Sequence, residues 1–206
     1  MNNIYGNLLV LSGPSGSGKS TIFKMLKSNC ENISFSISST SRLPRDGEVE
    51  GVDYYFISKE EFEFGIKNGD FIEYAEVHGN YYGTSKRVLN EAIVKPNNIL
   101  VLDIDVQGFL QLKNEYKKYL TSIFLTPPSK AILKQRLEAR ATDSTDSIKG
   151  RLLNALNEMI EIDEYDYLLV NDDLKETYQK IEFIVGSMAS KSSLIDTEKF
   201  ILDWNN

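Results

Sequence analysis

Residues 13–21 read GPSGSGKST and match the phosphate-binding pattern G-x-x-x-x-G-K-[ST] at every required position. An apolar run at 7–12 precedes them and a helix-like segment at 19–28 follows, which is the strand, loop and helix order that the motif requires. Glycines let successive backbone N–H groups turn inward around a phosphate chain. A flexible Gly/Ser loop has a similar composition but lacks these flanks. The motif predicts a nucleoside triphosphate site made by Gly13, Pro14, Ser15, Gly16, Ser17, Gly18, Lys19, Ser20 and Thr21.

Two side chains of this loop carry its expected chemistry. Lys19 is placed to reach the outer phosphates of the nucleotide. The hydroxyl of Ser20 is a hard oxygen ligand, which suits Mg²⁺ shared with phosphate oxygens and water, and Thr21 offers a second hydroxyl beside it. We therefore expect a Mg²⁺-bound nucleotide.

The net charge of −7 restricts the other partners of the chain. Proteins that hold long nucleic acids usually carry an excess of Lys and Arg, so we expect small phosphate-bearing ligands that are bound locally. No apolar stretch approaches the ~20 residues needed to cross a bilayer, and the N-terminus does not resemble a signal peptide. The single cysteine cannot form an internal disulfide. We expect a cytoplasmic protein that does not bind membranes.

Strand-like and helix-like segments alternate along the 206 residues, which favours one α/β domain with a mainly parallel sheet flanked by helices. Because ligands gather at the carboxyl ends of parallel strands, Asp103 and Asp105 should share a sheet edge with the phosphate loop. Strands are expected at 7–12, 98–104, 120–125 and 167–171, and helices at 19–28, 86–94, 106–115, 129–140, 147–163 and 174–190.

Two segments interrupt this alternation. Residues 37–85 are rich in short aromatic segments, at 53–57, 71–77 and 80–84, and predict an inserted, partly antiparallel subdomain. Within it, residues 58–61 form a capping box that should start a short helix, and residues 78–80 should form a tight turn. A polar loop at 141–147 predicts a mobile lid within residues 129–164. The core would then be 1–36, 86–128 and 165–206.

Arg42 and Arg45 stand three residues apart around Pro44. Their planar guanidinium groups suit a monophosphate, which they can bind through paired N–H donors. The hydroxyls of Ser38, Tyr54 and Tyr82 could add donors to the same phosphate. The same arginines could instead pair with the neighbouring acidic residues of a solvated loop, which are Asp46, Glu48 and Glu50. This segment alone does not decide between the two interpretations.

Several motifs, taken in order, make the chain resemble guanylate kinases over almost its whole length. These enzymes transfer the γ-phosphate of ATP to GMP and act in purine nucleotide metabolism and GMP recycling. The resemblance rests on the phosphate loop, on STSRLPRDGEVEGVDY at 39–54, GNYYGT at 79–84, LDIDVQG at 102–108, RLEAR at 136–140 and VNDD at 170–173. It implies a P-loop NTPase fold, an inserted mixed α/β GMP-binding subdomain at 37–85, a small lid, and the substrates ATP and GMP with Mg²⁺. Acceptance of dGMP and the oligomeric state are left open.

The resemblance implies roles for residues in the GMP half of the site. It implies that the GMP phosphate is held by Ser38, Arg42, Arg45, Tyr54 and Tyr82. It also implies that the guanine is bound by Glu73, Thr84 and Asp105, and that Asp103 binds GMP as well. A carboxylate such as Glu73 can accept from both N1–H and N2–H₂ of guanine, and adenine presents no such pair. From its own pattern, Glu73 could equally be an exposed strand residue.

The resemblance also implies that Lys19, Arg45, Arg140 and Arg151 stabilise the transferring phosphoryl group, and that Arg136, Asn171 and Asp172 bind ATP. Arg136 and Arg140 lie four apart and so on one helix face. Individually, the helix arginines could merely pair with Glu138 or Asp146, and Asn171 and Asp172 could cap a helix.

A rival function is a non-catalytic guanylate-kinase-like module that binds phosphopeptides. Such modules usually have a damaged phosphate loop, whereas this loop is intact. The family often has Thr, Trp and Gly where Ser41, Tyr74 and Ala141 stand, and none of these departures removes a charged group.

Overall fold

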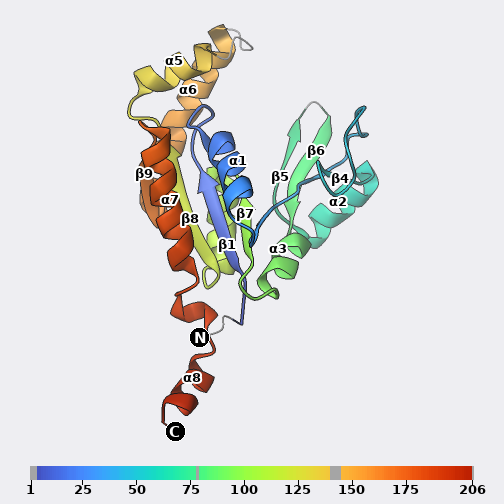
Figure 1. The fold of residues 1–206 in the computed structure, drawn as a ribbon. Coiled ribbons are helices and arrows are strands. Elements are labelled where there is room, and N and C mark those ends of the chain that lie inside the picture. The colour runs from blue at the N-terminus through green and yellow to red at the C-terminus, as the bar shows by residue number, and fades with distance from the viewer. Residues whose placement is uncertain (1–3, 78, 140–144, 206) are drawn as a thin grey trace.

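The computed structural model describes residues 4–77, 79–139 and 145–205, which form a core with a five-stranded sheet and a side lobe with a four-stranded sheet (Figure 1). The core sheet has the order β2-β7-β1-β8-β9 with parallel pairings throughout. Its strands are β1 (Asn7–Ser12), β2 (Ile33–Phe35), β7 (Ile99–Leu102), β8 (Leu120–Thr126) and β9 (Tyr167–Val170). The helices that flank it are α1 (Lys19–Asn29), α3 (Lys86–Ile93), α4 (Val106–Tyr116) and α7 (Leu174–Met188). The predicted α/β class is confirmed.

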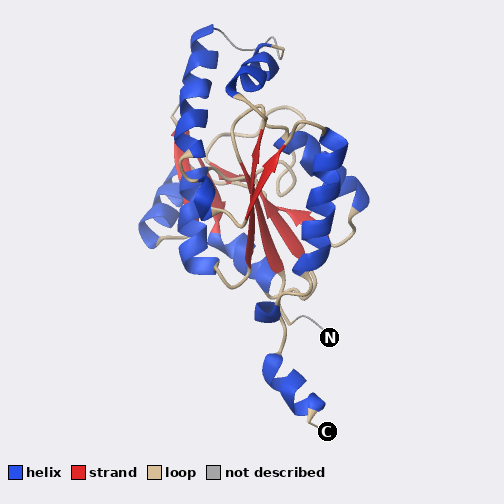
Figure 2. Ribbon diagram, turned by 90° about the vertical axis from the view of Figure 1, so that its left-hand side faces the viewer, coloured by secondary structure: helices blue, strands red, loops and turns tan. Residues whose placement is uncertain are grey.

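The central strand β1 is buried on both faces, which explains why its sequence is apolar without alternation. Leu8 and Val10 pack with α3 and α4 on one face of the sheet, and Leu9 and Leu11 pack with α1 and α7 on the other. Figure 2 shows the sheet between these helix layers. Because β1 runs directly into the phosphate loop, its double-sided packing fixes that loop at the carboxyl edge of the sheet.

The side lobe has the strand order β4-β3-β6-β5, and β6 pairs antiparallel with both β3 and β5. Its elements are β3 (Ser39–Thr40), β4 (Tyr55–Phe56), α2 (Lys59–Asn68), β5 (Phe71–Val77) and β6 (Asn80–Ser85). The predicted capping box forms, since Ser58 Oγ accepts from the Glu61 N–H at 3.1 Å and Glu61 Oε2 accepts from the Ser58 N–H at 2.7 Å. The strand expected at 53–57 shrinks to two residues, and the expected turn includes residue 78, which lies outside the described residues.

Phe62 of α2 forms the centre of the side lobe. Its ring is fully buried and stacks on Phe71 at 4.1 Å and on Tyr81 at 5.2 Å between ring centroids. We expect Phe62→Ala to lower the free energy of unfolding by about 3–5 kcal/mol, because it leaves a cavity in a small core. Phe64→Ala is the matched control, since Phe64 is 65% exposed on the same helix. Equal urea midpoints for the two variants would contradict this packing.

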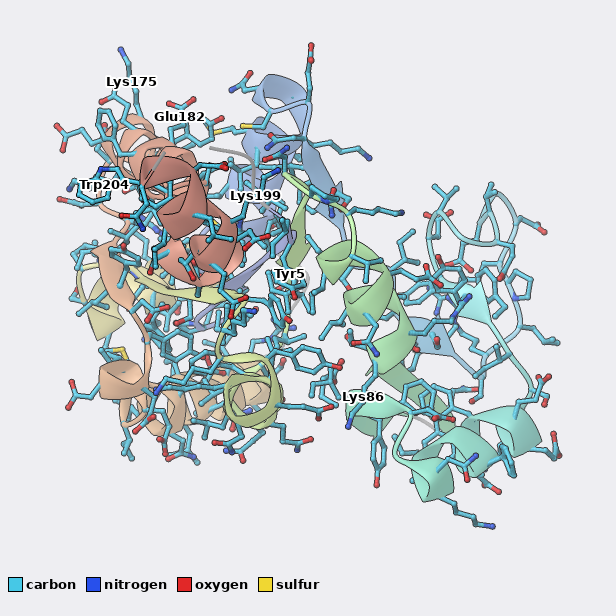
Figure 3. The ribbon with its side chains drawn as sticks, turned by 90° about the horizontal axis from the view of Figure 1, so that it is seen from below. Tyr5, Lys86, Lys175, Glu182, Lys199 and Trp204 are labelled. Atoms are coloured by element: carbon cyan, nitrogen blue, oxygen red, sulfur yellow. The ribbon has the colours of Figure 1, made fainter. Side chains whose placement is uncertain are left out.

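The chain returns from the side lobe to the core at Lys86. The Lys86 N–H donates to the Asp70 carbonyl at 2.8 Å, and its ammonium lies 2.7 Å from Glu115 of α4. Figure 3 shows Lys86 where α3 meets the side lobe. On the same boundary, β5 packs against α4 so closely that a Cβ on Gly108 would lie 2.8 Å from Cγ of Glu73. The packing therefore brings Glu73 to the N-terminus of α4.

A pair of helices, α5 (Lys130–Glu138) and α6 (Thr145–Met159), lies beyond the carboxyl edge of the core sheet (Figure 1). Ser129 caps α5 by accepting from the Ile132 N–H at 3.2 Å. The helices pack through an apolar cluster of Leu133, Leu137, Ile148, Leu152 and Ala155. The helix expected at 147–163 instead ends at Met159 and is followed by a 3₁₀ turn, Ile162–Glu164. Residues 140–144, where the lid loop and Arg140 were expected, lie outside the described residues.

One further expected boundary was wrong, and two elements were not expected. The strand expected at 98–104 ends at Leu102, because Asp105 caps α4 and the chain must turn before it. The three-residue β2 and the terminal helix α8 (Thr197–Trp204) were not expected. β2 is too short to show a period, and α8, which follows the 3₁₀ turn Ser192–Leu194, projects from the core with no buried residue (Figure 1). None of the helices in the described residues combines the length and the apolar composition of a membrane span.

Candidate active site

The phosphate loop takes a backbone path that only glycine tolerates at two decisive points. Gly13 has φ 136°, and a Cβ there would lie 2.0 Å from the Leu125 carbonyl oxygen. Gly18 has φ 107°, and its Cβ would lie 2.3 Å from Nδ2 of Asn171. L-residues with a side chain rarely adopt such angles, and the neighbouring atoms leave no room. The two glycines thus let the loop pack against β8 and the turn between β9 and α7.

Lys19 follows the loop at the first position of α1, and its Nζ donates to the Gly13 carbonyl at 2.6 Å. This contact curls the side chain back over a cavity of about 390 Å³. The described residues lining the cavity are Gly13, Ser15, Gly16, Gly18, Lys19, Ser20, Asp103, Ile104, Asp105 and Glu158. The predicted edge is confirmed, because both aspartates lie beside the phosphate loop.

Asp103 lines this cavity, so its side chain is in contact with solvent although many protein atoms lie around it. Burial by these surroundings raises the pKa of its carboxyl, and the nearby Lys19 ammonium acts in the opposite direction. The structure thus places Asp103 beside the lysine of the phosphate loop. Its expected part in binding GMP stays a prediction.

Helices α5 and α6 each send an arginine to the region of the phosphate loop. Arg151 Nη1 donates to Ser15 Oγ at 2.6 Å, and Arg136 Nη2 donates to the Asn171 carbonyl at 2.8 Å. Asn171 is buried, and its Nδ2 donates to the Ser17 carbonyl at 2.7 Å. Two predicted arginines and Asn171 are therefore joined to the loop through a continuous set of hydrogen bonds.

The alternative that Asn171 and Asp172 cap a helix is wrong. Asp173 caps α7, because its carboxylate accepts from the Glu176 N–H at 2.8 Å. Asp172 is exposed at the same corner. The β9–α7 turn thus leaves the amide of Asn171 free to hold the loop backbone.

Arg42 is paired in the way that the solvated-loop alternative proposed. Its two Nη atoms donate to Glu48, at 2.9 Å to Oε2 and 2.8 Å to Oε1, and its guanidinium lies 5.5 Å from the centroid of the Tyr54 ring. Hydrogen bonding to Glu48 raises the pKa of Arg42 and lowers that of Glu48. Arg42 Nε is nonetheless buried and has no partner among the described residues. That unused donor points to a further acceptor.

Tyr54 and Tyr82 lie beside Arg42, with their rings edge to face and 5.9 Å apart. Arg45 is exposed, and its guanidinium forms no ion pair within the part of the chain that the structure describes. Its backbone N–H donates to Oε2 of Glu48 at 2.7 Å. Ser38 is half-buried before β3. Arg42 and the two tyrosines therefore lie together, and Arg45 remains exposed at the surface.

Glu73 is half-buried, so the interpretation as an exposed strand residue is wrong. It sits opposite Thr84 in the β5–β6 register, and Thr84 Oγ1 donates to Glu73 Oε1 at 2.6 Å. Burial raises the pKa of Glu73, the Thr84 hydrogen bond acts against this, and the nearby Asp105 carboxylate adds to the rise. Asp105 itself caps α4 by accepting from the Gly108 N–H at 2.8 Å. Three predicted residues thus meet where the side lobe faces the core.

Glu158 is a charged lining residue that could not be recognised from the sequence. It lies on α6, seven residues after Arg151, a spacing of about two helical turns that places both on one face. That spacing was the available signal, but a single glutamate on a polar helix resembles any solvated residue. Packing of α5 against α6 turns this face toward the cavity.

Comparisons with known proteins give one consistent result. A family model described as guanylate kinase matches residues 5–188. The guanylate kinase of Wolinella succinogenes is 45% identical over 201 residues, covering 98% of this chain and 93% of the relative. That of Helicobacter pylori is 44% identical over 206 residues, covering 100% and 98%. The crystal structure of guanylate kinase from Anaplasma phagocytophilum has a TM-score of 0.73 at 35% identity, covering 98% of this chain and 96% of that one.

Proposed function

The chain belongs to the guanylate kinase family, and from this premise we propose how its residues transfer the γ-phosphate of ATP to GMP. The phosphate loop holds ATP with Arg136, Asn171 and Asp172, and the side lobe holds GMP. The residues proposed for GMP are Ser38, Arg42, Arg45, Tyr54, Glu73, Tyr82, Thr84, Asp103 and Asp105. The corresponding division is a core of 1–36, 86–128 and 165–206, a GMP-binding subdomain of 37–85 and a lid of 129–164.

Asp105 carries this proposal. It lines the phosphate-loop cavity and also lies close enough to Glu73 to influence the pKa of that carboxyl. Asp105 therefore lies between the proposed ATP-binding half and the proposed GMP-binding half of the site. A protein that merely binds one triphosphate needs no second set of arginines and tyrosines on the other side of Asp105.

Positioning and positive charge account for most of the proposed catalysis. The transferring phosphoryl group spreads its charge over its oxygens, and the acceptor phosphate is already ionised, so no general base is needed. Lys19, Arg45, Arg140 and Arg151 supply the compensating charge. Arg151 already reaches Ser15 of the loop. Closure of the side lobe and lid would exclude water, which otherwise competes as the acceptor.

The residues present fit a Mg²⁺ ion that is shared with the nucleotide. The described residues contain no group of three or more His, Cys, Asp or Glu that could hold a metal by itself. Ser20 and Asp103 instead offer hard oxygen atoms in the cavity, and Mg²⁺ is typically bound through one or two protein oxygens, phosphates and water. We propose that Ser20 ligates Mg²⁺, which would neutralise phosphate charge.

Arg42 would donate to the GMP phosphate while it keeps its ion pair with Glu48. Glu48 occupies one N–H on each Nη atom, and the buried Nε lacks a partner among the described residues. The Leu43 carbonyl accepts a further Nη1 N–H at 2.6 Å, and because a guanidinium carries five N–H groups, the Nε donor remains for another acceptor. The ion pair therefore serves to orient Arg42 against Tyr54.

A coupled assay with ATP, Mg²⁺ and each nucleoside monophosphate tests the proposed function. We expect GDP from GMP and negligible turnover of AMP, CMP and UMP. Absence of GDP together with tight binding of phosphopeptides would favour the non-catalytic module instead. The proposed setting is the cytoplasm, with ATP and GMP as small-molecule partners.

The pH dependence of GMP binding tests Glu73. Only the ionised carboxylate accepts from both guanine donors, so KM for GMP should rise as pH falls. Because burial raises the pKa of Glu73, the rise should begin at a higher pH than for an ordinary glutamate. KM is measured from about pH 8 to about pH 5 in the wild type and in Glu73→Gln. The variant controls for titration of the GMP phosphate, and identical profiles would refute the assignment.

A further inference from the structure

Glu158 reaches the phosphate-loop cavity because two sets of contacts hold α6 in place. Leu152 and Ala155 are buried against α5, and Arg151 donates to Ser15 of the loop at 2.6 Å. Glu158 lies about two turns after Arg151 on the same face and lines the cavity with Lys19 and Ser20. The carboxylate is therefore held at the donor site by the packing of its helix.

Carboxylates outnumber cations among the described residues that line this cavity, so the lining repels an anionic ligand. Among the described lining residues, Lys19 is the cation, and Asp103, Asp105 and Glu158 are carboxylates. Burial raises the pKa of Glu158, and Lys19 acts in the opposite direction, which fits a carboxylate facing the lysine in a partly dry space. A free nucleotide polyphosphate brings several further negative charges. A divalent cation bound to those phosphates would cancel two of their charges and so weaken the repulsion from Glu158.

We infer that Glu158 makes binding of the phosphate donor selective for the Mg²⁺-bound nucleotide over the free nucleotide. The carboxylate repels a free polyphosphate and attracts the cation that accompanies a complexed one. This inference rests on the proposed donor site at the phosphate loop. It assigns Glu158 to specificity, and the arginines and Lys19 keep their roles in transfer.

Calorimetric titration with ADP, once with excess Mg²⁺ and once with EDTA, tests the inference at about pH 8, where a glutamate is ionised. The measured quantity is the ratio of the two dissociation constants. In Glu158→Gln, we expect free ADP to bind about tenfold tighter and the preference for Mg²⁺-ADP to fall by about tenfold or more. A role limited to holding α6 in place would shift both constants alike.

Two further variants make the outcome decisive. Glu161→Gln removes the same charge from a residue that lines a neighbouring hollow with Glu158 but not the phosphate cavity, so its ratio should stay within about twofold of wild type. Glu158→Asp keeps the charge and should keep most of the preference, even if Glu158→Gln folds poorly.

An unchanged ratio in a folded Glu158→Gln, or lost preference in Glu158→Asp, would overturn the inference while leaving the proposed function intact. If the wild type bound neither form of ADP, the proposed donor site itself would fail.

Discussion

Replacing Lys19 by methionine is expected to lower kcat by about 10²- to 10³-fold, because one preorganised charge is removed from a partly enclosed site. The ammonium of Lys19 lies over the phosphate-loop cavity, where its Nζ donates to the Gly13 carbonyl at 2.6 Å. Methionine has a similar length and helix propensity, so the change removes charge rather than packing. Steady-state kinetics with saturating ATP and GMP measure the effect.

Lys27→Met is the matched control, because Lys27 is exposed in the last turn of the same helix. Its kcat should stay within about twofold of wild type, because exposed charges away from a site are screened by salt. Comparable losses in both variants would show that the effect arises from the helix and not from the phosphate site.

Replacing Arg45 by alanine is expected to lower kcat by about 10²-fold or more, through lost stabilisation of the charge on the transferring group. The free energy of unfolding should change by less than about 0.5 kcal/mol, because Arg45 is exposed and the described residues give its side chain no ion pair. This separation of activity from stability distinguishes a catalytic arginine from a structural one. Kinetics and urea denaturation of the same preparation measure both quantities.

Arg87→Ala provides the control for Arg45. Arg87 is also an exposed arginine, on α3 beside the side lobe, and it lies 3.6 Å from Glu91. Its loss should change kcat by less than about twofold. Near-normal turnover in Arg45→Ala would remove Arg45 from the proposed mechanism.

The phosphate loop could be predicted from sequence because the residues that define its motif are local. A buried strand, glycines and a helix follow one another within residues 7–29, and the loop conformation depends on those neighbours. The capping box at Ser58 and the cap at Ser129 were predictable for the same reason. Each cap is a hydrogen bond from a backbone N–H to the serine side chain three residues earlier, so the residue types within one helical turn indicate it.

The partners of charged side chains could not be predicted, because they depend on tertiary packing. The hydrogen bond between Glu73 and Thr84 needs the β5–β6 register, and the proximity of Asp105 needs β5 to pack against α4. The sequence left open whether Arg42 binds Glu48 or a phosphate, and the structure shows the Glu48 pair with one donor still unused. Glu158 was missed because only the α5–α6 packing directs it into the cavity.

We expect the phosphate loop and the side lobe to be the two halves of one two-nucleotide site. The most direct measurement uses an adenosine and a guanosine joined by a chain of five phosphates. It should bind as one molecule per chain, compete with both ATP and GMP, and weaken strongly in both Lys19→Met and Arg45→Ala. Binding of two molecules per chain, or competition with only one of the two substrates, would contradict the account.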